Sequence, residues 1–283
     1  MSDSRNESEP VARLGLAAIG RRLPGDKLAG RMAHRDEIIA FLDELLEISA
    51  FSDYGPNGLQ VPGAEEVSRV VTGVSAQLEL FERAAAAGAQ LVLCHHGLFW
   101  EFHSRSISPA MQQRLRVLFD ADMSLAGYHL PLDAHPEVGN NALICAALGF
   151  EQAEPFAEHR GRAIGFVGRL PNGIQFAELQ RRCVEAFEQE PFVFDSGPEL
   201  VRSVGVVSGG ADSSFGEAIE RGLDAFVTGE AAEHVMAEAR EGGVHYIAAG
   251  HYATERRGIR RLGELVAERF GVDHEFVEIP NPI

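Results

Sequence analysis

The sequence predicts an α/β fold made of two duplicated α/β units, each a sheet flanked by helices. The first observation is a strand–helix–strand pattern over VSRVVTGVS, LELFERAAAAG and AQLVLCHHG. The second is the return of this pattern as VRSVGVVSG, FGEAIERG and LDAFVTGE. Four positions recur with one constant spacing: Val67 with Val201, Val70 with Val204, Ala84 with Ala218, and Gly88 with Gly222. A repeated strand–helix–strand unit indicates that the sheet itself is duplicated.

The elements follow in three segments. We expect residues 1–31 to form a flexible extension, because the segment begins with polar residues and contains a Pro-Gly pair near its end. Residues 32–150 form the first unit, which opens with an amphipathic helix from His34 to about Ser49 and carries the HHG and HxxxD motifs. Residues 151–283 form the second unit. It adds strands and a helix around FAELQRRCVEAFEQ and carries the TGE and GHYATE motifs.

The composition excludes several classes of protein. The chain has 283 residues and a net charge of −17, which argues against binding nucleic-acid phosphates. No apolar run approaches the ~20 residues of a membrane span. MSDSRNESEP has the character of neither a signal nor a transit peptide. We therefore expect a cytoplasmic protein without a membrane partner, and three cysteines without CxxC spacing fit a reducing compartment.

Two histidine–carboxylate pairs follow predicted strands. His129 precedes Asp133 by four residues after SLAGY, and His251 precedes Glu255 by four residues after YIAAG. Strand ends converge on one edge of a sheet, where imidazoles and carboxylates together suit a divalent cation. Either pair alone is also common at a turn, where it caps the backbone, or on an exposed surface, where it binds no ion.

Two adjacent histidines, His95 and His96, close the strand in LVLCHHG. On a regular strand their side chains point to opposite faces, so both reach one site only if the strand ends there. Gly97 permits such an end. The alternative is that one of the two histidines caps a loop and the other is a polar residue whose hydrogen bonds are satisfied by the protein. Cys94 is a candidate thiolate, but strand alternation directs it away from His95 and favours the core.

Local spacing also predicts how two ligands are held. Pro131 and Pro136 flank Asp133, so we expect its loop to be stiff and kept out of a helix. His251 and Glu255 share one face if a helix begins near Tyr252.

The combined set of ligands exceeds the needs of one zinc ion. Five ligands suit two divalent ions that share a carboxylate and activate a water molecule near neutral pH. Imidazole with carboxylate favours zinc, iron or manganese over calcium. The predicted metal ligands are His95, His96, Asp133, His251 and Glu255.

Three further residues are candidate general acids or bases: His129, Glu230 and His234. The alternative for each is that it only orients a ligand. Tyr54, in the polar loop DYGPNGLQ, is a candidate substrate contact, as are Asn57 and Gln60, although a turn needs similar residues anyway.

These motifs resemble a known family. DYGPNGLQV, LVLCHHGLFW, HLPLDAH, VTGE and GHYATERRG occur in this order over residues 34–283. They resemble the NIF3-like proteins, also called dinuclear-metal-centre hexameric proteins or homologues of the type 2 form of GTP cyclohydrolase 1. The resemblance implies a NIF3-like fold with mixed sheets and a toroidal homohexamer. It also implies two metal ions per subunit on the five predicted ligands, with Glu255 bridging.

Two functions follow as hypotheses. One is a metal-dependent hydrolase of a nucleotide-like or other small substrate, in the manner of a GTP cyclohydrolase. The alternative is a non-catalytic metal-binding ring that acts as a scaffold or regulatory interaction protein. Nucleic-acid binding through the RRGIRR segment belongs to the alternative, although a solvated helix face explains that segment as well.

Overall fold

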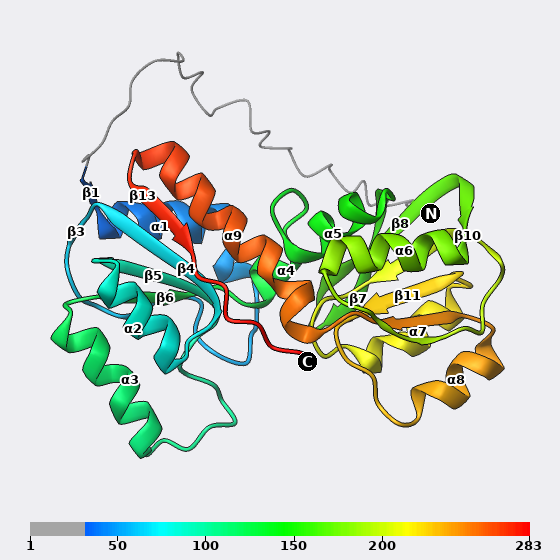
Figure 1. The fold of residues 1–283 in the computed structure, drawn as a ribbon, viewed down its shortest axis with the longest axis horizontal. Helices are drawn as coiled ribbons and strands as arrows, with labels where there is room; N and C mark the ends of the chain where they lie inside the picture. Colours follow the sequence, from blue (N-terminus) through cyan, green and yellow to red (C-terminus); the bar gives the residue numbers. More distant parts are fainter. Residues whose placement is uncertain (1–31) are drawn as a thin grey trace, which may run out of the picture.

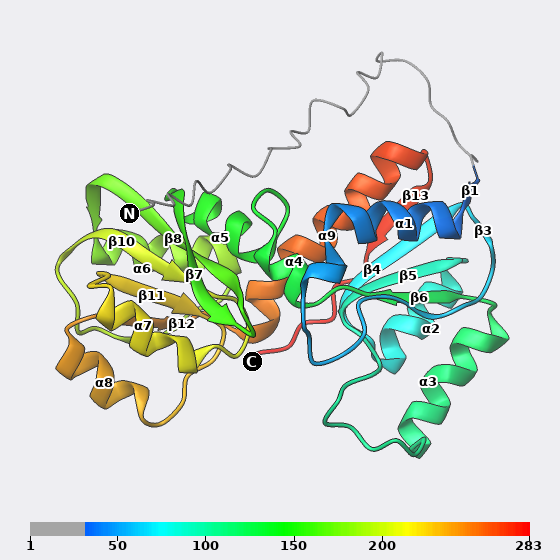
Figure 2. The same ribbon diagram turned by 180° about the vertical axis from the view of Figure 1, so that it is seen from behind.

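Two mixed sheets, each with helices on both faces, form the two lobes of the computed structural model (Figures 1 and 2). The structure describes residues 32–283, and the predicted extension over residues 1–31 lies outside the described residues. The first sheet has the strand order β13-β4-β5-β6-β2, and the second has the order β7-β8-β10-β11-β12-β9. The predicted α/β class with duplicated units is confirmed.

The first copy of the duplicated unit runs from a helix through an edge strand into three parallel strands. β4, β5 and β6 are parallel neighbours, and β2 pairs antiparallel with β6. The elements of this copy are α1 (Arg35–Leu45), η2 (Ile48–Ala50), β2 (Gly58–Val61), β4 (Arg69–Ser75), α2 (Leu78–Ala86), β5 (Leu91–His96), α3 (Pro109–Asp120) and β6 (Ser124–Gly127). The short strands β1 (Ala33–His34) and β3 (Glu66–Val67) pair beside it.

The second copy repeats this order in the other lobe. β10, β11 and β12 are parallel, and β9 pairs antiparallel with β12, as β2 does with β6. Its elements are α6 (Phe176–Phe187), β9 (Phe192–Phe194), β10 (Leu200–Val206), η3 (Asp212–Ser214), α7 (Phe215–Glu220), β11 (Ala225–Thr228), α8 (Val235–Gly242) and β12 (His245–Ala248). The second copy is shorter because α8 has 8 residues where α3 has 12, and because it lacks the long loop 97–108.

The remaining elements connect the copies. α4 (Leu130–Ala134) and α5 (Asn140–Leu148) lead into β7 (Glu151–His159) and β8 (Arg162–Gln175), and α9 (His251–Phe270) leads into β13 (Asp273–Phe276). β13 pairs parallel with β4, so the chain ends in the first sheet. The sequence places residues 151–283 in the second unit, but β13 lies in the sheet of the first lobe. It returns there because apolar side chains of α9, such as Ile259 and Leu262, are buried in the core of that lobe.

Strand alternation separates the two faces of each sheet. Val70 of β4 packs with Ile38 of α1 and Ile259 of α9, whereas the next residue, Val71, packs with Leu80 of α2. In the second lobe, α5 and α6 cover one face and α7 and α8 cover the other. α9 contributes to the cores of both lobes and thereby holds them together. Among residues 32–283, no helix combines the length and the apolar character that a membrane span requires.

One local expectation was wrong. Asp133 does not lie in an extended loop but in the short helix α4. Pro131 stands in the first turn of that helix, where its missing N–H group costs no hydrogen bond and its fixed φ suits a helix. The two prolines therefore stand in the first turn of the helix and just after its end, where they do not prevent it from forming.

Candidate metal centre

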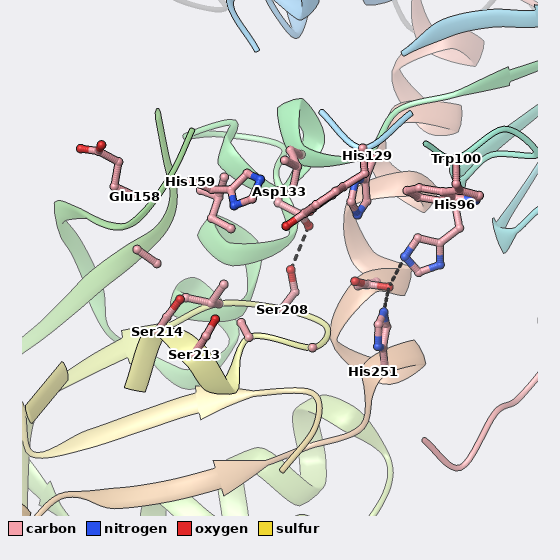
Figure 3. Close-up of a pocket in the computed structure, with 18 of the residues that line it drawn as sticks. His96, Trp100, His129, Asp133, Glu158, His159, Ser208, Ser213, Ser214 and His251 are labelled. Atoms are coloured by element: carbon pink, nitrogen blue, oxygen red, sulfur yellow. Dashed lines mark hydrogen bonds and ion pairs between the residues drawn. The ribbon is translucent and has the colours of Figure 1, made fainter. Parts of the chain in front are cut away.

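Side chains from both lobes meet where the parallel strands β5, β6 and β12 end (Figure 3). His95 and His96 are the last two residues of β5, so the strand ends where the sequence analysis required. Asp133 lies in α4, which follows β6, and His251 begins α9, which follows β12. The convergence of strand ends thus brings the predicted ligands together.

Glu255 occupies the centre of the cluster and is only 3% exposed. Its Oε1 lies 3.5 Å from Nε2 of His95, and its Oε2 lies 3.1 Å from Nε2 of both His96 and His251. Burial by itself raises the pKa of this carboxyl, but the imidazoles around it outweigh burial and hold the pKa well below 4.5. One oxygen of this carboxylate therefore faces the imidazole of His95, and the other faces those of His96 and His251.

Asp133 completes the set on the His95 side. Its Oδ2 lies 3.5 Å from Nε2 of His95. Its Oδ1 accepts hydrogen bonds from Nδ2 of Asn140 and Oγ of Ser208, each at 2.8 Å. Two donors therefore fix one oxygen and leave the other directed at the cluster.

The three imidazoles share one orientation. Nδ1 of His95 donates to the carbonyl of Tyr128 at 2.9 Å, and Nδ1 of His96 lies 3.1 Å from Oγ of Ser75. Nδ1 of His251 donates to Oε1 of Glu230 at 2.5 Å. In each ring Nδ1 is engaged by the surrounding protein, and Nε2 faces the carboxylates. Partners on the far nitrogen are what fix the ring and the tautomer of a metal-binding histidine.

The donor atoms fit a divalent cation. Nε2 of His95 and Oε2 of Glu255 are buried without a hydrogen-bond partner among the described residues. Burial lowers the pKa of His95, but Asp133 and Glu255 outweigh it and raise the value to about 10. The same competition, with Glu255 and Glu230 as the carboxylates, raises the pKa of His251 to about 9. Unpaired donors in a strongly negative environment are satisfied by a cation.

Gly209 shows how closely the second lobe approaches the cluster. Its φ is +69°, and a Cβ there would overlap Oε1 of Glu255 and lie 3.2 Å from Nε2 of His251. Its N–H donates to Oγ1 of Thr254 at 3.0 Å. Glycine at position 209 therefore allows the second lobe to pack closely against the candidate ligands.

His129 lies beside the cluster, held by a residue that the sequence analysis missed. Its Nδ1 donates to Oδ1 of Asp53 at 2.7 Å, and a ring nitrogen lies within 4.8 Å of those of His95 and His96. Burial raises the pKa of Asp53, but hydrogen bonds, first of all from His129, bring it down to about 2. The sequence feature that could have pointed to Asp53 as a site residue is its position as the first residue of the polar loop DYGPNGLQ.

The other two acid–base candidates occupy different positions. Glu230 contacts His251 at the nitrogen that faces away from the cluster, so it orients that ring. His234 is half exposed, lies 3.8 Å from Asp212, and is not among the residues that line the adjoining pocket. The structure therefore brings Glu230 to the site as a supporting group and leaves His234 outside it.

A pocket of about 600 Å³ opens beside the cluster, and Tyr54 lines it as anticipated. Asn57 and Gln60 instead hold neighbouring backbone: Asn57 accepts from the N–H of His129, and Gln60 accepts from the N–H of Leu98. Cys94 is buried in the apolar core, where burial raises the pKa of its thiol, so its reading as a core residue is confirmed.

The fold and the cluster define a duplicated α/β protein with a candidate metal centre between its two lobes. The chain belongs to the Duf34/NIF3 (NGG1p interacting factor 3) family, whose family model matches residues 33–282.

Similar proteins cover nearly the same length. A protein of Pseudomonas aeruginosa called GTP cyclohydrolase 1 type 2 homolog is 42% identical, over 85% of this chain and 95% of its own. A solved structure described as protein ybgI of unknown function is 41% identical with a TM-score of 0.84, over 89% of this chain and 100% of its own. A structure from Thermus thermophilus is 33% identical with a TM-score of 0.80, over 89% and 100% of the two chains.

Proposed function

We propose that this protein binds two divalent metal ions and uses them as a hydrolase. The observation that carries the proposal is the division of Glu255 between two sets of donors. Its Oε1 faces His95, which Asp133 also approaches, and its Oε2 faces His96 and His251. Five ligands in two groups that share one carboxylate match the number of protein ligands in a two-metal site. The imidazole and carboxylate donors fit zinc, iron or manganese.

The chain's own residues can supply proton transfer. Metal ions held by these donors would supply Lewis acidity and would lower the pKa of a water near the site. His129 is the group placed to hold or move a proton there, because Asp53 accepts its Nδ1 hydrogen and leaves Nε2 free at the pocket. A carboxylate that fixes an imidazole in this way sets its tautomer and direction. His234 has no part in this proposal.

The substrate is a small molecule that enters the pocket beside the cluster. The name of the P. aeruginosa relative makes GTP the first compound to test, followed by other nucleotide-like compounds. The pocket volume of about 600 Å³ lies within the range of sites that bind ligands of this size.

The test measures metal content and turnover together. Protein purified without chelators should contain two metal ions per chain, and the zinc-, iron- or manganese-loaded protein should turn over a member of a metabolite pool. His95→Ala and Glu255→Ala should both lose metal and activity, whereas His234→Ala, a histidine outside the pocket, should keep both. Activity that survives both ligand changes contradicts the mechanism. Two bound ions without turnover anywhere in the pool favour the scaffold alternative instead.

The Arg-rich segment supplies little support for the nucleic-acid version of that alternative. Arg256 and Arg260 pair with Glu278, and Arg261 pairs with Glu264 and Glu268. Carboxylates thus already compensate these guanidinium groups, which leaves less free positive charge for phosphates.

We also propose that the protein assembles as a homohexamer. The family membership supports this, together with exposed apolar side chains outside the pocket, such as Phe119 on α3. Light scattering after size-exclusion chromatography should give six times the 30.7 kDa chain mass, and a monomer mass would contradict the assembly.

A further inference from the structure

Aromatic side chains from four separate segments line one wall of the pocket. Trp100 and Phe102, in the loop after β5, are stacked with ring centroids 5.6 Å apart. Tyr54 lies 4.9 Å from the ring of His159, and His129 meets Trp100 edge-on at 5.0 Å. We name this group, Tyr54, Trp100, Phe102, His129 and His159, the aromatic wall. Phe102 is 68% exposed, so its face is available to a ligand.

The opposite wall consists of small residues from the second lobe. Figure 3 shows Ser213 and Ser214 across the pocket from His159. Gly210 and Ala211, which precede them in the chain, also line the pocket. Small side chains facing aromatic rings leave a slot suited to a flat group, and the two serine hydroxyls can donate or accept hydrogen bonds at its edge.

The charge of the pocket restricts what such a flat group carries. Within the described part of the chain, the lining includes four carboxylates and neither lysine nor arginine. The nearby Arg160 is already engaged, with its guanidinium over the ring of Tyr54 and bonded to Glu101 at 2.6 Å. Away from the cluster, residues 32–283 therefore offer no cationic side chain to a phosphate chain, whereas aromatic faces and carboxylates favour a neutral or cationic ring.

We propose that the pocket binds a planar, neutral or cationic aromatic or heteroaromatic ring against the aromatic wall, without a dedicated contact to phosphate. Hydrolysis of the bound molecule at the cluster would rest on the proposed function, whereas binding of the ring does not. Ring binding is therefore measurable in protein that holds no metal and performs no reaction.

Trp100 makes this measurement direct, because it is the single tryptophan of the chain and belongs to the aromatic wall. Chelator-treated full-length protein is titrated with guanosine, with GTP and with ribose 5-phosphate while Trp100 fluorescence is followed. Guanosine should change the fluorescence saturably, GTP should bind no more tightly than guanosine, and ribose 5-phosphate should have no effect. A GTP affinity at least tenfold above that of guanosine overturns the absence of phosphate recognition, and no saturable response to guanosine overturns ring binding.

Two variants separate the wall from general effects on the protein. Phe102→Ala should weaken guanosine binding about tenfold, the size of effect expected from losing one aromatic–base stack. Phe192→Ala removes an exposed phenylalanine on β9, outside the pocket, and should leave the affinity unchanged. Both side chains are largely exposed, so neither change should impair folding, which circular dichroism verifies. Equal affinities in Phe102→Ala and wild type would overturn the role of the wall. Ring binding without catalysis would leave this inference standing while the hydrolase proposal fails.

Discussion

His129 and His251 occupy equivalent positions in the two copies of the fold. Each follows the third parallel strand of its sheet, and each donates through Nδ1 to a carboxylate, His129 to Asp53 at 2.7 Å and His251 to Glu230 at 2.5 Å. Their Nε2 atoms differ in surroundings, because that of His251 lies 3.1 Å from Glu255. The duplication has therefore produced one candidate ligand and one candidate proton-transfer group from the same structural position.

The partner of His251 should control metal affinity. Glu230→Ala removes the acceptor that fixes the His251 ring, so we expect metal affinity to fall about 10–100-fold, with one of the two ions affected more than the other. Isothermal titration calorimetry of metal-free protein measures both binding steps. His234→Ala, four residues further along, is the control and should match wild type. Unchanged affinity in Glu230→Ala would show that the hydrogen bond has no orienting role.

Gly209 should be required for metal binding although it is not a ligand. Gly209→Ala places a methyl group against Glu255, so metal affinity should fall about tenfold or more. Gly222→Ala is a matched control, because Gly222 also has a positive φ, +62°, but its Cβ would meet no atom of residues 32–283 within 4 Å. Both variants carry similar backbone strain, and only the first disturbs the cluster. Equal metal content, measured by mass spectrometry, would count against this explanation.

The Asp53–His129 pair should make stability depend on pH. The pKa of Asp53 is about 2 in the folded chain against a usual 3.8, so its contribution is present above 3.8 and is lost as pH falls through about 2. Because the side chain is buried, the shift corresponds to about 2 kcal/mol at neutral pH. Asp53→Asn should lose this amount in urea unfolding at pH 7, and the difference from wild type should shrink toward pH 3.

Asp43 provides a control of opposite sign for that experiment. Burial raises its pKa, so its ionised form is disfavoured in the fold, and its contribution to stability grows as pH falls. Asp43→Asn should therefore show a difference from wild type that changes with pH in the other direction. Identical pH profiles for the two variants would contradict both assignments.

Metal removal should destabilise the protein. Ions bound at the cluster would satisfy Nε2 of His95 and Oε2 of Glu255 and would bind only the folded state, so we expect them to raise the unfolding temperature. At roughly a hundredfold excess of metal over its Kd, the increase should be about 5–10 °C by calorimetry. Glu255→Ala should respond little to chelator. A chelator shift as large in this variant as in wild type would show that the ions bind elsewhere.

Local sequence patterns were sufficient for most of the fold and for the gathering of the candidate ligands. His95-His96 end a strand, and His251 with Glu255 begin a helix, as predicted. These features depend on periodicity and on where strands end, which neighbouring residues determine. Asp133 shows the limit of such reasoning, since the same proline pattern fits a stiff loop and a short helix that starts at a proline.

The sequence by itself determined the duplicated strand–helix order and the residue types at the strand ends. Only the tertiary structure decided that β13 joins the first sheet, that Asp53 holds His129, and that Trp100 lines the same pocket as Ser213 and Ser214. These contacts join segments far apart in the chain, and their geometry depends on how the two lobes pack around α9. No local pattern encodes such a contact, because many partners of similar chemistry are available until packing selects one.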